Sequence, residues 1–148
     1  MAGELTGTFD GSEVHVIIGA VPLSGFSDGD SVVVRKSADY YASKSGLDGA
    51  VGRARNTDKR GEFEIHLMQT SSANDELSAL LNLDTLTSDG KVVIPVSVMD
   101  FSGRTVMAAA QAWIKTLGDV AFSTNDVGER VYTFECAALQ VFIGGNNI

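Results

Sequence analysis

The fold is indicated most clearly by one short stretch, which reads Glu62-Phe63-Glu64-Ile65-His66-Leu67. Polar and apolar side chains alternate along it without a break. Successive side chains of a β-strand point to opposite faces of a sheet, so this period of two predicts a half-buried strand. We expect its apolar side chains to face the core and its polar ones, Glu62, Glu64 and His66, to face the other way.

Apolar patterns on both sides of this stretch predict more strands. We expect them at residues 14–18, 32–34, 92–98 and 131–143. Pro95 has no N–H to donate to a ladder, so its strand should lie at a sheet edge or carry a bulge there. In the last run the apolar phase shifts near residues 137–138, which indicates a second bulge.

Two further segments concern helices. Ser72-Ala73-Asn74-Asp75 has the form of a capping box, and three leucines follow at helical spacing, so a short helix is expected at about 73–82. Residues 105–117 are ambiguous. Their alanines and apolar spacing favour a helix, yet the turn-like sequence at 100–103 suggests a hairpin that returns from the preceding strand.

Charge is distributed unevenly along the chain. Residues 35–60 contain seven basic and three acidic residues, a net charge of +4, whereas the whole chain carries −8 and the remainder therefore −12. Opposite patches on identical chains attract one another, so the pattern favours self-association. The acidic remainder argues against tight binding of DNA, which depends on Lys and Arg at the phosphates.

The basic region coincides with a long segment, residues 37–61, that is rich in Gly and Ser. It is too long for an ordinary loop in a compact domain, and its scattered apolar side chains favour an extended arm that becomes ordered against a partner. The residues expected to contact another subunit are Tyr40, Tyr41, Leu47, Arg53, Arg55, Lys59 and Arg60.

The sequence offers no catalytic or cofactor-binding motif. His15 and His66 lack Cys, His or carboxylate neighbours at metal-ligand spacing, and Glu62 with Glu64 fits a solvated strand face better than a catalytic pair. Cys136 lies in an apolar run and is expected to be a buried structural thiol. We therefore expect no enzyme, no cofactor and no metal site.

Length and composition indicate one domain over residues 1–148. The apolar runs are too short to cross a bilayer, so no membrane insertion is expected. The N-terminus lacks the basic and apolar regions of a signal peptide, and we expect synthesis in a cytosol without an export signal.

Three stretches carry a family resemblance. The charged turn and strand at 52–65, the Ser/Asn-rich helix start at 70–77, and the strand and tight turn at 96–104 resemble the tail tube proteins of contractile-tailed bacteriophages. The likeness runs over most of residues 10–145.

The resemblance implies a mainly β fold, a two-sheet β-sandwich or barrel with one short α-helix and a long arm, in which 105–117 is a strand. It further implies hexameric rings with a continuous inner β-barrel, stacked into the virion's inner tail tube for genome ejection. The implied partners are other copies of the chain, the tail sheath, tape measure, baseplate and tail terminator proteins, and double-stranded DNA that passes non-specifically. We expect Glu62, Glu64 and His66 to line the channel.

Two other functions stay open. The tube of a type VI secretion system or related contractile injection machine resembles the same fold. A small-ligand-binding β-barrel module would instead be a monomer with a closed pocket and a dispensable 37–61 loop.

Overall fold

The computed structural model describes residues 3–86, 90 and 92–147. Its elements are a 3₁₀ turn η1 (Gly11–Glu13), strands β1 (Val14–Ile18), β2 (Val21–Pro22), β3 (Val32–Lys36), β4 (Tyr41–Ser45), β5 (Val51–Arg55) and β6 (Gly61–Met68), helix α1 (Ala73–Leu86), and strands β7 (Ile94–Asp100), β8 (Val106–Leu117), β9 (Glu129–Cys136) and β10 (Gln140–Phe142).

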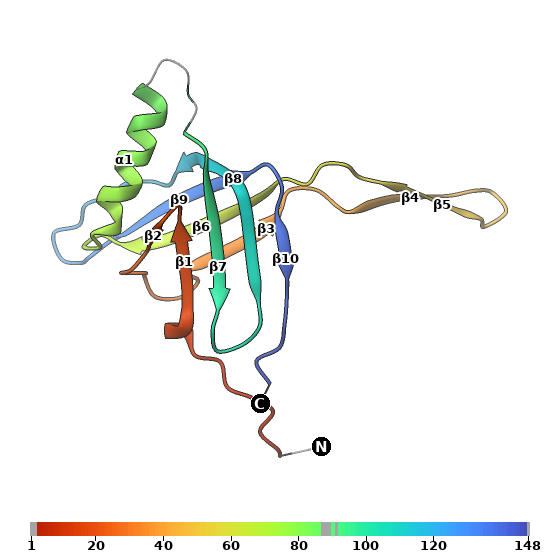
Figure 1. Cartoon of the computed structure of the whole chain (residues 1–148), viewed down its shortest axis with the longest axis horizontal. Helices are drawn as coiled ribbons and strands as arrows, with labels where there is room; N and C mark the ends of the chain where they lie inside the picture. The colour runs from red at the N-terminus through yellow and green to blue at the C-terminus, as the bar shows by residue number, and fades with distance from the viewer. Residues whose placement is uncertain (1–2, 87–89, 91, 148) are drawn as a thin grey trace.

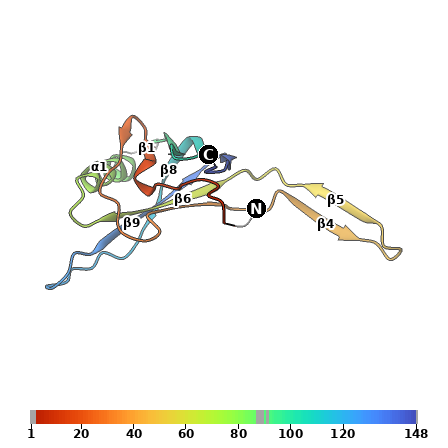
Figure 2. The same cartoon turned by 90° about the horizontal axis from the view of Figure 1, so that it is seen from below.

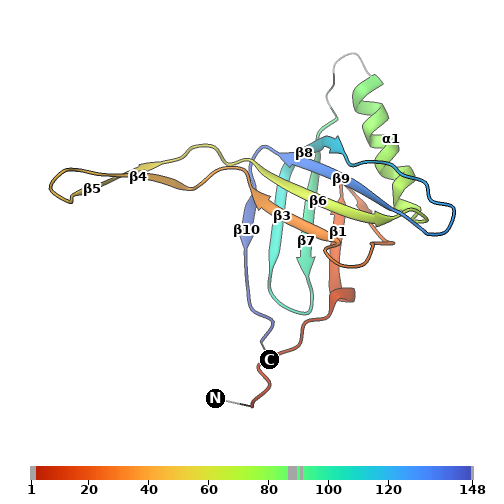
Figure 3. The same ribbon diagram turned by 180° about the vertical axis from the view of Figure 1, so that it is seen from behind.

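The main sheet follows the order β2-β1-β7-β8-β9-β6-β3, and β10 also pairs with β8. Strand β8 belongs to two layers, because its first half pairs with β7 and β10 while residues 112–117 pair with β9. One layer, with β1 and β7, crosses the other, with β3, β6 and β9 (Figures 1 and 3). The result is a mainly β sandwich with one helix, and the described strands do not close into a barrel.

The core lies between these layers and under α1. It contains the apolar face of β6, where Phe63, Ile65 and Leu67 are fully buried, together with Phe134 of β9. Residues of β1 and β7 pack against them in the same cluster, and α1 contributes Leu77. The predicted alternation of residues 62–67 is confirmed, since burial alternates along all of β6.

Strand β8 confirms the family expectation for residues 105–117 and overturns the local helix propensity. The ladders with β7 and β9 fix its backbone, and the small side chains of Ala109 and Ala112 are buried between neighbours. Tertiary pairing therefore outweighs the helical preference of alanine.

The two bulges expected from the sequence meet different outcomes. The register of β7 shifts between Ile94 and Val96, so Pro95 lies at a bulge, and β7 is an inner strand rather than an edge. The bulge expected at residues 137–138 is wrong, because β9 ends at Cys136 and the chain bends before β10 begins.

Helix α1 begins at Ala73 as expected but continues to Leu86, one turn beyond the predicted end. The hydroxyl of Ser71 accepts from the Ala73 N–H at 3.2 Å, so the capping side chain lies one residue earlier than the predicted Ser72. No helix in the described part of the chain is long and apolar enough to span a membrane.

Candidate functional site

The most prominent surface feature is the arm, a two-stranded hairpin of β4 and β5 that projects from the end of β3 and β6 (Figures 1 and 2). Every residue of its two strands is exposed. Leu47 at its tip is fully exposed, and Val51 is 69% exposed. The guanidinium of Arg53 lies 4.1 Å from the Tyr41 ring centre, a cation–π contact across the two strands. The predicted extended arm is thus confirmed in shape.

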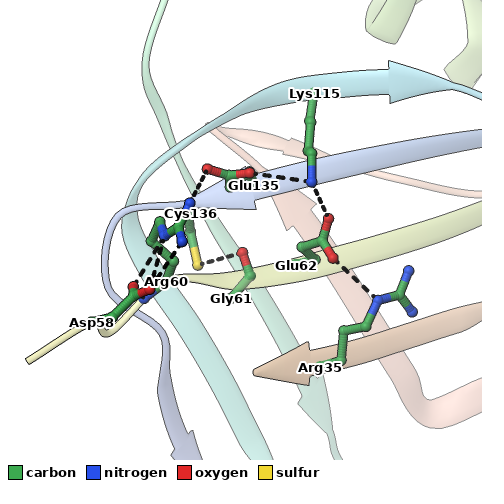
Figure 4. Close-up of polar contacts among 8 residues, drawn as sticks. All are labelled: Arg35, Asp58, Arg60, Gly61, Glu62, Lys115, Glu135 and Cys136. Atoms are coloured by element: carbon green, nitrogen blue, oxygen red, sulfur yellow. Dashed lines mark hydrogen bonds and ion pairs between the residues drawn. The ribbon is translucent and has the colours of Figure 1, made fainter. Parts of the chain in front are cut away.

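The base of the arm is fixed to the body by polar contacts within the chain (Figure 4). Arg60 lies 2.9 Å from Asp58 Oδ2 and 3.8 Å from Glu135 Oε1. The hydrogen bonds from Arg60 lower the pKa of Asp58 to about 2. Lys36 Nζ donates to the Asp58 carbonyl at 2.8 Å. Arg60 therefore already has carboxylate partners in its own subunit.

The remaining predicted arm residues divide between tip and base. Tyr40, Tyr41 and Lys59 line a groove of about 360 Å³ at the base, closed on the other side by Leu139 and its neighbours. Leu47 lies far from that groove, beyond the strand pairing of the hairpin. The contact of these residues, and of Arg53 and Arg55, with another copy of the chain stays a prediction.

The second candidate surface is the polar face of β3, β6, β8 and β9. The expected channel residues Glu62 and Glu64 do lie on one face of β6, but both are ion-paired. Arg35 of β3 lies 3.3 Å from Glu62, and Lys115 of β8 lies 2.9 Å from the same carboxylate (Figure 4). Arg35 also lies 2.6 Å from Glu64. Hydrogen bonds from Lys115 and Arg35 lower the pKa of Glu62 against the effect of burial.

His66 continues this network toward the far end of β6. Its ring nitrogens lie 2.7 Å from Glu64 Oε1 and 2.8 Å from Glu129 Oε1. Ser27 donates its hydroxyl to the same Glu129 carboxylate. Burial alone would lower the pKa of His66, but its two carboxylate partners outweigh burial and raise it.

The carboxylates of this polar face are mostly paired with cations. Among the described residues the network contains five carboxylates, Asp58, Glu62, Glu64, Glu129 and Glu135, and three permanent cations, Arg35, Arg60 and Lys115. Sequence reasoning missed the pairing of Glu62 with Arg35 and Lys115, because these two cations lie on other strands, 27 and 53 residues from Glu62 in the chain. The alternation of polar and apolar residues within β9 is the local signal that places Glu129 and Glu135 on the polar face.

Two strand edges of this layer lack a partner in the described part of the chain. Strand β3 ends the sheet order, and Trp113–Leu117 of β8 pair with β9 on one side alone. The backbone N–H of His66 donates to the Ser31 carbonyl, and the backbone N–H of Ser37 donates to the Arg60 carbonyl. The backbone groups of the odd-numbered residues of β3 therefore point toward β6. The backbone groups of Val32, Val34 and Lys36 therefore face the open side.

The histidines, the cysteine and the carboxylates of the described residues were the candidates for a metal site. No group of three or more His, Cys, Asp or Glu in residues 3–86, 90 and 92–147 could hold a metal ion. Cys136 is buried, as expected, and its Sγ donates to Gly61 O at 3.4 Å. Burial raises the pKa of this thiol, which suits a structural role.

Comparison with known proteins bears on what these surfaces do. Residues 16–144 match the sequence model of the bacteriophage PhiTE tail tube protein family. Structural protein ORF10 of Pseudomonas phage KPP10 is 26% identical over 152 residues, which cover 99% of this chain and 87% of that protein.

Solved structures share the fold at low sequence identity. The sheath/tube terminator of the extracellular contractile injection system PVC superposes with a TM-score of 0.65 at 16% identity, covering 96% of this chain and all of that one. A chain of the PVC sheath–tube complex gives 0.60 at 9%, covering 91% of each chain. A chain of a native gene transfer agent virion gives 0.61 at 14%, covering 92% of this chain and all of that one.

Proposed function

Because this chain belongs to the bacteriophage PhiTE tail tube protein family, we propose that its copies close into hexameric rings and that these rings stack into the inner tube through which the phage genome leaves. The chain is a structural protein of the phage virion, of the kind that builds tail tubes. Ring size, stacking and genome passage are the parts of the proposal that go beyond family membership.

The observation that carries the proposal is the pair of open edges on the polar layer. Neighbouring strands in β3, β6, β9 and β8 are all antiparallel, so β3 and β8 run in opposite directions. If the β3 edge of one copy meets the β8 edge of the next, the new pair is antiparallel too, and the same step repeats. Open edges are a liability in a monomer, and ring closure removes them.

The polar face then becomes the channel wall. Strands β1 and β7 and helix α1 lie on the opposite side of the layer, where the core is, so they form the outer part of the ring (Figure 3). The cations of the polar face are already held by Glu62, Glu64 and Glu135. A wall of this kind offers few free cations to DNA phosphates, so a passing duplex finds no deep binding minimum.

The partners follow from this arrangement. We propose the sheath on the outer surface, the tape measure protein and then the DNA in the channel, and the baseplate and terminator proteins at the tube ends. The PVC structures that share this fold include a sheath–tube complex and a sheath/tube terminator. They also keep open a tube role in a related injection system, although the family match favours a phage tail. We propose no catalytic role, since the relatives are structural proteins.

Electron microscopy of the purified protein at high concentration tests the proposal. We expect rings or tubes with a central channel. The companion variant replaces residues 41–55 by a Gly-Gly turn and keeps the Asn56 N to Tyr40 O hydrogen bond of 2.9 Å at the base of the arm. It should fold and retain ring contacts but form no tubes. A wild-type protein that stays monomeric would refute the proposal, and a shortened variant that still polymerises would exclude the arm as the stacking element.

A further inference from the structure

The two ends of the subunit carry opposite charge. The arm, taken as residues 40–56, contains three cations and Asp48, a net charge of +2. At the far end of β6 three loops meet, residues 24–31, 69–76 and 118–130. They carry seven carboxylates and one cation, Arg130, a net charge of −6 for these described residues.

Printed contacts hold these three loops together as one surface. Gln69 and Gly128 exchange two hydrogen bonds, with Gln69 N donating to Gly128 O at 2.9 Å and Gly128 N donating to the Gln69 side chain at 3.0 Å. The Tyr132 hydroxyl donates to Asn74 Oδ1 at 3.0 Å, and Ser27 bonds to Glu129. We name this surface, formed by residues 24–31, 69–76 and 118–130, the acidic end.

The acidic end also contains an apolar groove of about 400 Å³. Leu117, Val120 and Phe122 line it, and they are 48%, 56% and 79% exposed. The guanidinium of Arg130, the one cation among these described residues, lies 5.1 Å from the Phe122 ring centre and makes a cation–π contact with it. Exposed apolar side chains beside carboxylates suit a partner that is apolar and basic at once.

The arm has this chemistry. Its tip presents Leu47 and Val51, both largely exposed, and Arg53 and Arg55 follow on the same strand, β5. No carboxylate of the described residues forms an ion pair with either arginine. From residue 40 to the tip at residue 48 the hairpin spans about 26 Å, at about 3.3 Å per residue, so it can reach a neighbouring copy.

The positions of arm and groove fit a head-to-tail contact. The arm leaves the sheet at the first residue of β6, Gly61, and points away from the end of β6 where α1 begins (Figures 1 and 2). The groove lies at that opposite end, where Gln69, the residue after β6, lines it. A second copy displaced along the strand direction thus brings its acidic end to the arm of the first. Such a contact joins two different surfaces and can repeat without limit, as stacking requires.

We propose that the groove of the acidic end receives the arm of a copy in the adjacent ring, with Leu47 placed against Phe122 and the arm arginines beside the carboxylates of residues 118–130. This inference rests on the proposed function, since it identifies the receiving surface for the stacking arm.

Disulfide trapping in assembled tubes tests the contact. The variant carries Leu47→Cys and Phe122→Cys, and each single substitution is a control that also covers the buried native Cys136. After oxidation we expect a ladder of linked oligomers on a non-reducing gel from the double variant alone. The matched control pairs Leu47→Cys with Phe101→Cys, because Phe101 is 61% exposed but lies in the turn between β7 and β8, outside the acidic end.

A charge exchange gives a second readout. Arg53→Glu with Arg55→Glu, or Asp119→Lys with Asp126→Lys, should each reduce tube formation at least tenfold, and the chain with all four changes should regain tubes. Tubes that form without the Leu47–Phe122 ladder, a ladder from the Phe101 control, or a four-fold variant as defective as each pair would overturn this inference alone. A wild-type chain that forms no tubes would overturn the proposed function and this inference with it.

Discussion

Nδ1 of His66 lies 2.8 Å from Oε1 of Glu129, which joins β6 to β9 on the polar face. The other ring nitrogen faces Glu64, whose second oxygen is held by Arg35. His66 is therefore the titratable centre of a network that ties three strands together, and the loop residue Ser27 anchors its far side.

This placement predicts a pH-dependent stability. The pKa of His66 is raised above its usual 6.5 in the folded state, so protonated His66 stabilises the fold fully below the unfolded pKa. That contribution is lost as pH rises through the folded pKa. We expect Tm to fall as pH rises above about 6.5, and calorimetry should show that His66→Gln removes most of this decline.

His15→Gln is the matched control for this change, because it removes the other histidine from a site that is about half exposed. A decline that His15→Gln removes as fully as His66→Gln would contradict the assignment to His66. The pKa values of Glu64 and Glu129 are lowered, so their contributions disappear in acid and do not overlap this window. A decline that persists without His66 would show that another group causes it.

A glycine at the base of the arm should resist substitution. A Cβ on Gly61 would lie 2.8 Å from Leu139 Cβ and 3.1 Å from the Arg35 carbonyl oxygen, so the turn after β9 or strand β3 must shift. We expect Gly61→Ala to lower the free energy of unfolding by about 1–3 kcal/mol in urea titrations. Gly52→Ala in the arm meets nothing within 4 Å and should stay within about 0.5 kcal/mol of the wild type. Equal effects at the two sites would contradict the close packing at Gly61.

The arm arginines and Arg60 should behave differently. Arg53 and Arg55 lie on an exposed strand, whereas Arg60 is paired with Asp58 and Glu135. Reversing Arg53 and Arg55 to Glu should block tube assembly and leave Tm almost unchanged. Arg60→Glu places three carboxylates together, so it should lower Tm by a few degrees, whatever its effect on tubes.

Salt gives an independent check on the arm arginines. Raising ionic strength from about 0.1 to 1 M shortens the screening length from about 10 to 3 Å. Light scattering should then show weaker wild-type assembly. Assembly that is insensitive to salt would indicate that apolar burial by Leu47 and Val51 dominates the contact.

How much of this fold can be predicted from sequence depends on the range of the interactions. The period of two in residues 62–67 is a local signal, and β6 follows it residue by residue. The Gly/Ser-rich arm is visible for the same reason. The strand at 106–117 is not, because its conformation comes from ladders with β7 and β9. Local propensity favoured a helix, and the strand was indicated by the family resemblance and by the turn-like sequence at 100–103.

The polar face shows the same limit for the candidate site. Alternation placed Glu62 and Glu64 on one face correctly, but their partners Arg35 and Lys115 lie 27 and 53 residues from Glu62 in the chain. The register of β3 and β8 against β6 and β9 decides those pairs, and no local pattern encodes it. The carboxylates expected to line the channel are therefore paired with cations in the fold.

The ion pairs on that face lead to the last prediction, which concerns DNA. Replacing Glu62 and Glu64 by Gln keeps the shape of both side chains and leaves Arg35 and Lys115 without their carboxylates on β6. Arg35 and Lys115 are nearly half exposed, so water can solvate them after the change. Ion pairs at the surface contribute about 0–1 kcal/mol each, so the protein should still fold and assemble. If this face lines the channel, the freed cations can contact phosphates. DNA binding by assembled tubes should then rise, with a salt dependence steeper by about 0.9 in log–log slope for each new contact, and genome delivery should slow while tube length stays normal. Glu4→Gln with Glu13→Gln, both before β1 and outside the polar face and the acidic end, should change neither. Tubes of the Glu62 and Glu64 variant that bind DNA no better than wild-type tubes would place this face outside the channel, and the ring and stacking contacts would be unaffected by that result.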